Sequence, residues 1–229
     1  MSEPTPNPKP RDRTSLGGFL TIATVSALIA GGGAYYFLGQ NQPAQEARLE
    51  QTPAGCVLNP PARIGGPISL IDQTGARVTQ ANYAGHPTLI YFGFTHCPDI
   101  CPTAMYLVGE SLPLMGEAGA SVHTALVTVD PDRDTPDQLA SYITTDGFPP
   151  RLTGLTGNQD EIAAAARAFA VNYQRQGEGA DYTMSHTSFV YLMSPDWHPL
   201  AMMSTIGRTP QQLAACLSQG LAAQSTGGT

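Results

Sequence analysis

Short apolar runs typical of buried strands alternate with helix-start patterns from residue 62 onward, and this alternation limits the possible folds more than any other feature. Strands are predicted over 88–94, 122–129, 152–155, 187–193 and 200–204. Helices are predicted over 102–115, 135–144 and 162–170, and after 209. The predicted helices begin at a proline or follow a Thr or Asn cap, which are residues that favour a helix N-terminus.

The resulting order of elements is β-α-β-α-β-α-β-β-α, with two adjacent strands near the end. Alternating strands and helices favour a parallel sheet, and the final strand pair adds antiparallel pairing. The sequence therefore predicts an α/β fold, and a thioredoxin-like domain with a mixed central sheet satisfies the order. The span 62–222 is long enough for one packed core.

A second apolar segment precedes this domain. Residues 15–38 form a run of 24 residues without a charge, and a helix of this length reaches roughly 36 Å, enough to cross a hydrocarbon core of about 30 Å. Lys9, Arg11 and Arg13 precede the run, so the positive-inside rule predicts a cytoplasmic N-terminus. A cleaved signal peptide is the alternative, but the run is longer than the apolar part of such a peptide, which has about 7–15 residues.

The chain is therefore predicted to have five parts. These are a cytoplasmic tail (1–14), a single transmembrane anchor (15–38), a linker (39–61), the α/β domain (62–222) and a disordered tail (223–229). The formal net charge is −7, with one lysine in the whole chain. Nucleic acid is thereby excluded as a partner, because binding phosphates requires a cationic surface.

Cys97 and Cys101 lie in the turn between the strand predicted over 88–94 and the helix predicted from Pro102. Cys101 is then expected at the helix N-cap, where free N–H groups and the helix dipole favour a thiolate. Two thiols at this spacing can close a disulfide or bind a soft metal ion. A purely structural pair of cysteines is the alternative.

Each of the five histidines is a candidate third ligand. His186 precedes a predicted strand and would reach the cysteine turn only if that strand is in register, so a loop or core role is the alternative. His96 adjoins Cys97 and is expected to point away from a shared ion. His123 lies inside a predicted strand and is interpreted as structural, while His86 and His198 lie beside prolines and carry no functional pattern.

Three sequence blocks closely resemble signatures of the Sco/SenC/PrrC family, which are membrane-anchored copper proteins. The blocks are 93–102 (GFTHCPDICP), 129–136 (VDPDRDTP) and 181–186 (DYTMSH). They occur in the family's order, and the similarity extends from about 64 to 221. The combination is specific, whereas two cysteines at this spacing would be weak evidence alone.

The resemblance implies a thioredoxin-like fold with Cys97, Cys101 and His186 as ligands of Cu(I) and Cu(II). It implies delivery of copper to the binuclear (CuA) centre in subunit II of cytochrome c oxidase, and possible exchange with another periplasmic copper chaperone. The predicted location is the inner membrane, with the domain in the periplasm. The chain departs from the family at Ser185, where an Asp usually precedes the histidine. A carboxylate that could orient the imidazole is then missing.

Other functions remain open on the same residues. A thiol–disulfide reductase or a peroxidase-like protein would use Cys97 and Cys101 in covalent chemistry, so enzymatic activity is undecided. A membrane-tethered redox sensor is a third alternative.

Several further residues near this site have side chains that can bind a metal ion. Asp130, Asp132 and Asp134 are spaced like calcium ligands, but the glycine and distal Glu of an EF-hand loop are absent. Asp130 is expected beside the site, where it would tune the metal or bind a partner, and Asp134 is expected to support a helix start. Met184 is a possible auxiliary soft ligand.

Cys56 and Cys216 remain after the central pair is assigned. The predicted compartment is oxidising, and leftover thiols there tend to pair. The sequence therefore predicts a structural disulfide between them, which would attach the linker to the last helix.

Overall fold

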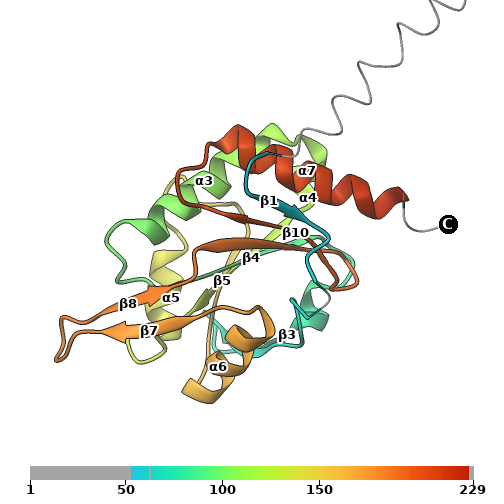
Figure 1. The fold of residues 1–229 in the computed structure, drawn as a ribbon. Coiled ribbons are helices and arrows are strands. Elements are labelled where there is room, and N and C mark those ends of the chain that lie inside the picture. The colour runs from blue at the N-terminus through green and yellow to red at the C-terminus, as the bar shows by residue number, and fades with distance from the viewer. Residues whose placement is uncertain (1–52, 62, 227–229) are drawn as a thin grey trace, which may run out of the picture. The chain divides into compact units, whose positions relative to one another are not determined.

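The computed structural model of the chain describes residues 53–61 and 63–226 (Figure 1). The predicted cytoplasmic tail and the predicted membrane anchor lie outside these residues. Within the part of the chain that is described, no helix is long and apolar enough to span a membrane.

An eight-stranded mixed sheet forms the centre of the domain, in the order β1-β10-β9-β4-β5-β6-β2-β3. The strands are β1 (Cys56–Leu58), β2 (Ser69–Asp72), β3 (Arg77–Thr79), β4 (Thr88–Gly93), β5 (His123–Thr128), β6 (Leu152–Thr156), β9 (Phe189–Met193) and β10 (Pro199–Ser204). Strands β4, β5 and β6 run parallel, while β9 pairs antiparallel with β4. The prediction of a mixed sheet is confirmed.

Helices cover both faces of this sheet. In the described residues they are η1 (Gln80–Tyr83), α3 (Ile100–Leu114), α4 (Glu117–Ser121), α5 (Pro136–Tyr142), α6 (Gln159–Ala168) and α7 (Pro210–Thr226). Helices α3 and α7 lie side by side over one face, and α6 lies on the other (Figure 1). Every residue of β4 is buried, which explains why residues 89–92 of this strand carry apolar side chains.

The predicted helix starts depend on capping, and the structure shows the caps. The Thr135 side chain accepts a hydrogen bond from the Gln138 backbone N–H, and Pro136 occupies the first turn of α5. Asn158 and Glu161 form a reciprocal capping box at the start of α6. These contacts satisfy backbone donors that a helix leaves free at its N-terminus.

Several boundaries differ from the predictions by a few residues, and three of these differences change how the domain is described. Helix α3 begins at Ile100, so Asp99 is the N-cap and Cys101 lies inside the first turn. Helix α7 continues to Thr226, beyond the predicted end of the domain at 222. The predicted linker contains β1, which pairs with β10 and therefore belongs to the folded unit.

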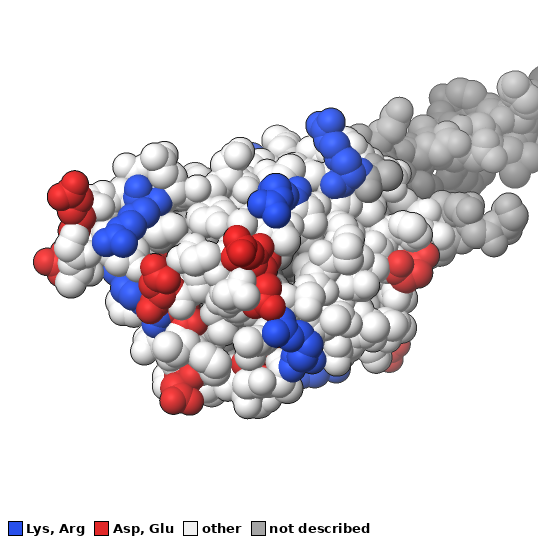
Figure 2. All heavy atoms as spheres, turned by 90° about the horizontal axis from the view of Figure 1, so that it is seen from below, with Lys and Arg blue, Asp and Glu red and all other residues white. Residues whose placement is uncertain are grey.

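A two-stranded hairpin was not predicted. Strands β7 (Tyr173–Gln176) and β8 (Thr183–His186) pair only with each other and form a second, smaller sheet. Neither strand contains a buried residue, so their sequences lack the apolar runs on which the strand predictions rested. The hairpin extends from the side of the domain (Figure 1). The face in Figure 2 carries scattered side chains of both charges.

Candidate metal centre

The turn that carries Cys97 follows the carboxyl end of β4 and leads into α3. Thr95, at the start of this turn, is held by Asp134, which follows β5 in sequence. The Asp134 carboxylate accepts hydrogen bonds from the Thr95 backbone N–H at 3.0 Å and from the Thr95 hydroxyl at 2.6 Å. It also accepts a hydrogen bond from the Thr128 hydroxyl at 2.6 Å. The turn is therefore fixed to the end of the neighbouring parallel strand.

The two thiols of this turn have different environments. Cys101 is fully buried, while Cys97 is half-buried, and both are free cysteines. The hydrogen bond from the Cys101 thiol is the main reason that the pKa of Cys97 is lowered to about 3, with further hydrogen bonds from His186 and two backbone N–H groups. The same hydrogen bond to Cys97, together with burial, raises the pKa of Cys101. Cys97 is thus the thiolate and Cys101 the thiol.

The expectation that Cys101 is the favoured thiolate is wrong. Its position inside the first turn of α3 leaves its sulfur buried, and burial disfavours the charged form. The Cys101 backbone N–H instead points to the Cys97 sulfur at 3.3 Å. The free N–H groups of the helix start therefore stabilise a thiolate that lies before the helix.

His186 is brought to the thiols by β8, whose last residue it is. Its Nε2 atom lies 3.4 Å from the Cys101 sulfur. Its Nδ1 atom lies 3.1 Å from the Thr187 carbonyl oxygen, and Nδ1–H can donate to that oxygen. The backbone carbonyl thus orients the imidazole, as a carboxylate at position 185 would. The rings of Tyr91 and Phe94 each form a T-shaped contact with the imidazole.

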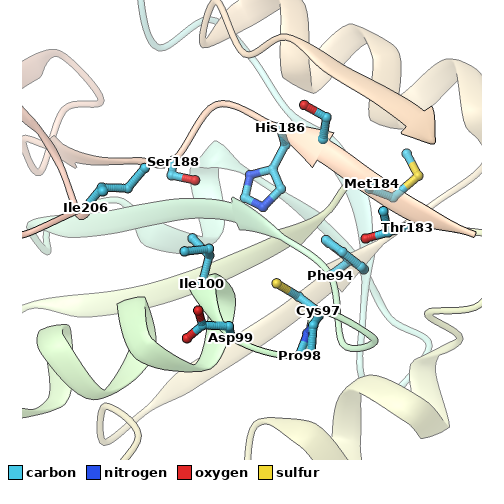
Figure 3. Close-up of a pocket in the computed structure, with 11 residues that line it drawn as sticks. Phe94, Cys97, Pro98, Asp99, Ile100, Thr183, Met184, His186, Ser188 and Ile206 are labelled. Atoms are coloured by element: carbon cyan, nitrogen blue, oxygen red, sulfur yellow. The ribbon is translucent and has the colours of Figure 1, made fainter.

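A pocket of about 340 Å³ opens at this site, between the cysteine turn and β8. Figure 3 shows the His186 ring and the Cys97 sulfur facing into the pocket. Met184 also lines it, with its sulfur directed away from that of Cys97 (Figure 3). In the described residues, no group of three or more His, Cys, Asp or Glu side chains is already arranged to hold a metal ion. The thiols and the imidazole meet as hydrogen-bonding partners.

The remaining histidines lie away from this contact. His96 Nδ1 faces the Thr95 hydroxyl at 3.1 Å and the Asp134 carboxylate at 3.6 Å, and so points away from the pocket as expected. His86 and His123 stack on each other with ring centroids 4.4 Å apart. His198 pairs with Asp196 in an exposed turn.

The three aspartates after β5 do not converge on one point. Asp130 accepts hydrogen bonds from Arg133 and Tyr182, and Asp132 accepts one from Gln159. Asp134 faces inward to the cysteine turn, so the expectation that it supports a helix start is wrong, because Thr135 caps α5. Asp134 was recognisable in the sequence only as one of several acids, since its role depends on the packing of β5 against β4.

Cys56 and Cys216 are joined by a disulfide with their Cα atoms 5.7 Å apart. The bond connects β1 at one edge of the sheet to α7. It lies apart from Cys97 and Cys101, which remain available for chemistry.

The thiolate character of Cys97 leads to a measurable pH dependence. In the reduced, metal-free chain, alkylation of Cys97 by iodoacetamide is expected to proceed at nearly the same rate at pH 5 as at pH 7, because its pKa of about 3 lies below both. A thiol with an ordinary pKa of about 8.5 would slow by about a hundredfold over the same range. Peptide mass mapping of the labelled site measures the rate.

The matched control is Cys101→Ala, which removes the thiol that donates to Cys97. In this variant the rate at Cys97 is expected to fall more steeply with decreasing pH. A hundredfold slowing of the unaltered chain would contradict the assignment of the thiolate.

The fold and the site define a class of protein. The chain has a thioredoxin-like domain in which a dithiol, at the start of the first long helix, faces a histidine from a separate hairpin. A model of the SCO1/SenC family matches residues 57–221. The chain belongs to the SCO1/SenC family.

Individual relatives agree with this assignment. The mitochondrial SCO1 homolog 1 of Arabidopsis thaliana is 44% identical over 137 residues, which are 59% of this chain and 40% of the relative. The chain thus aligns with less than half the length of that relative. The structure of Bradyrhizobium japonicum ScoI with copper bound is 41% identical, with a TM-score of 0.60 over 68% of this chain and 98% of that one.

A third relative is BsSco, described as having a disulfide switch and as a member of the Sco family of cytochrome c oxidase assembly proteins. It is 26% identical, with a TM-score of 0.56 over 71% of this chain and 97% of its own.

Proposed function

We propose that the chain binds copper through Cys97, Cys101 and His186 and serves the assembly of the binuclear copper centre in subunit II of cytochrome c oxidase. The observation that carries the proposal is the contact of a buried thiol with both a thiolate and an imidazole nitrogen. Thiolates select Cu(I), and imidazole suits copper in both oxidation states. The donor set therefore fits copper as cargo.

Two relatives support this proposal. The Bradyrhizobium japonicum protein has copper bound, and BsSco belongs to a family of oxidase assembly proteins. We extend both properties to this chain. A metal held by three donors leaves a position at which a partner's ligand can enter, and this suits a carrier that releases copper by ligand exchange, including exchange with another copper chaperone.

We place the domain in the periplasm, attached to the inner membrane by the anchor predicted over 15–38. The 24-residue uncharged run and the cations before it support this topology. The disulfide between Cys56 and Cys216 supports an oxidising compartment, because such bonds persist there.

A Cu(I) titration of the full chain against a competing chelator, under anaerobic conditions, tests the proposal. The unaltered chain is expected to bind one copper ion, and His186→Ala is expected to lower the affinity by at least about tenfold, because losing even an outer-shell partner of a metal ligand costs about 10–100-fold. His198→Ala is the matched control, since this histidine is exposed and paired with Asp196. Weak binding that His186→Ala leaves unchanged would contradict the proposal.

A thiol–disulfide reductase is the second candidate function, favoured by the half-buried Cys97 thiolate beside a buried thiol. Cys97 would attack a disulfide of the oxidase, releasing one substrate thiolate and forming a mixed disulfide. Cys101 would then lose its proton and attack the Cys97 sulfur, releasing the second substrate thiolate. The dithiol is oxidised to a disulfide while the substrate gains two electrons. Accumulation of a mixed disulfide in Cys101→Ala would support this chemistry. A redox sensor would use the same pair.

A further inference from the structure

The hairpin that presents His186 has little packing of its own. Across residues 172–187, Tyr182 is the one buried side chain, with 8% of its surface exposed. The register of the hairpin places Tyr173 opposite His186, and the remaining strand residues are half-buried or exposed. A two-stranded hairpin is marginally stable in water by itself. The position of His186 must therefore depend on contacts that attach the hairpin to the domain.

Tyr182 provides such a contact through its ring. The Arg133 guanidinium carbon lies 3.6 Å from the ring centroid, and that of Arg175 lies 3.7 Å from it. Two guanidinium groups this close to one centroid must occupy opposite faces of the ring. Arg175 belongs to β7, whereas Arg133 belongs to the loop after β5, so the ring is held between its own hairpin and the main domain. Cation–π contacts of this kind are stronger where the groups are partly desolvated.

The polar atoms of Tyr182 reach the same loop. Its hydroxyl donates to the Asp130 carboxylate at 2.5 Å, and its backbone carbonyl accepts from Arg133 Nη1 at 3.0 Å. Arg133 Nε in turn donates to Asp130 at 2.6 Å. Asp130 is buried and directly follows Val129, whose backbone N–H bonds to Gly93 at the end of β4. The contacts of Tyr182 thus attach the hairpin to the carboxyl ends of β4 and β5, where the cysteine turn begins.

We propose that Tyr182, held by Asp130, Arg133 and Arg175, is the positioning residue for the His186 imidazole. Tyr182 directly precedes β8 and His186 ends it. Fixing the first end of so short a strand limits the movement of the other end relative to Cys101. The inference deepens the proposed function, on which it rests for the role of His186 as a copper ligand.

Amide hydrogen exchange of the metal-free full chain tests the anchoring itself. Tyr182→Leu is expected to speed exchange in β8 at least about tenfold while leaving β4 and β5 unchanged. Tyr182→Phe keeps the ring between the guanidinium groups and loses only the hydroxyl, so its effect is expected to be smaller. Tyr83→Leu is the control, because this buried tyrosine stacks on Trp197 instead and should leave the relative exchange of β8 unaltered.

A copper titration then tests whether Tyr182 acts through His186. Tyr182→Leu is expected to lower copper affinity about tenfold and to weaken the imidazole nitrogen coupling in the pulsed EPR spectrum of the Cu(II) form, with Tyr182→Phe largely restoring both. In a His186→Ala background, Tyr182→Leu is expected to add little further loss, since residues that act through one contact are not additive.

Two results would overturn the inference while leaving the proposed function intact. One is that Tyr182→Leu leaves amide exchange in β8 unchanged. The other is that Tyr182→Leu lowers copper affinity equally in the unaltered chain and in the His186→Ala background. An unaltered chain that binds no copper would instead overturn the proposed function and the ligand-positioning role together. The exchange experiment contains no copper, so the two failures are distinguishable.

Discussion

Replacement of both Cys56 and Cys216 by alanine is expected to lower the free energy of unfolding of the domain by about 4 kcal/mol, because a cross-link between distant residues restricts the unfolded chain. The two cysteines are 160 residues apart in sequence, so the bond closes a loop that includes nearly the whole domain. For a domain of this size, such a loss corresponds to a fall of about 8–16 °C in the midpoint of thermal unfolding. Denaturant unfolding and thermal unfolding both measure the change.

Reductant provides the control for this prediction. Unfolding is repeated with the unaltered chain and the double alanine variant both fully reduced. The unaltered chain then lacks the same cross-link, and the difference in free energy of unfolding between the two proteins should largely vanish. A difference that persists in reductant would assign the effect to lost packing of the buried Cys216 side chain. Equal stability without reductant would contradict the prediction outright.

The second large effect is expected from Asp134→Ala. The Asp134 carboxylate is fully buried and accepts three hydrogen bonds, two from Thr95 and one from Thr128. The substitution leaves these donors without their acceptor, and a buried unsatisfied group costs about 1–3 kcal/mol. We expect a loss of about 3 kcal/mol in total, since some donors will find water or new partners. Denaturant unfolding measures it.

Asp134→Ala should also change the chemistry of the cysteine turn. Thr95 would no longer be held to the end of β5, so the backbone N–H groups that stabilise the Cys97 thiolate would lose their fixed positions. Alkylation of Cys97 is then expected to slow at pH 5 relative to pH 7. Asp132→Ala is the matched control, because this carboxylate is exposed and bonds only to the Gln159 amide among the described residues. An equal effect of the two substitutions would contradict the role given to Asp134.

Much of the fold follows from local sequence patterns. The fully buried β4 carries an apolar run over residues 89–92, and α5 and α6 begin at the caps that the sequence predicts. Such patterns are readable because burial and capping act on residues that are close together in the chain. By contrast, β7 and β8 expose most of their side chains and pair only with each other, so no local pattern marked them.

The sequence by itself determined which chemical groups are present at the site: two thiols in a strand-to-helix turn and, through the resemblance of the block that ends in it, the histidine at 186. Only the tertiary structure decided which thiol is the thiolate. Cys101 is buried and donates to Cys97, and this depends on where α3 begins and how it packs. The structure also decided that His186 reaches the Cys101 sulfur, across 85 residues of sequence. The physical reason is that burial and long-range contacts depend on the packing of distant segments, which no local pattern records.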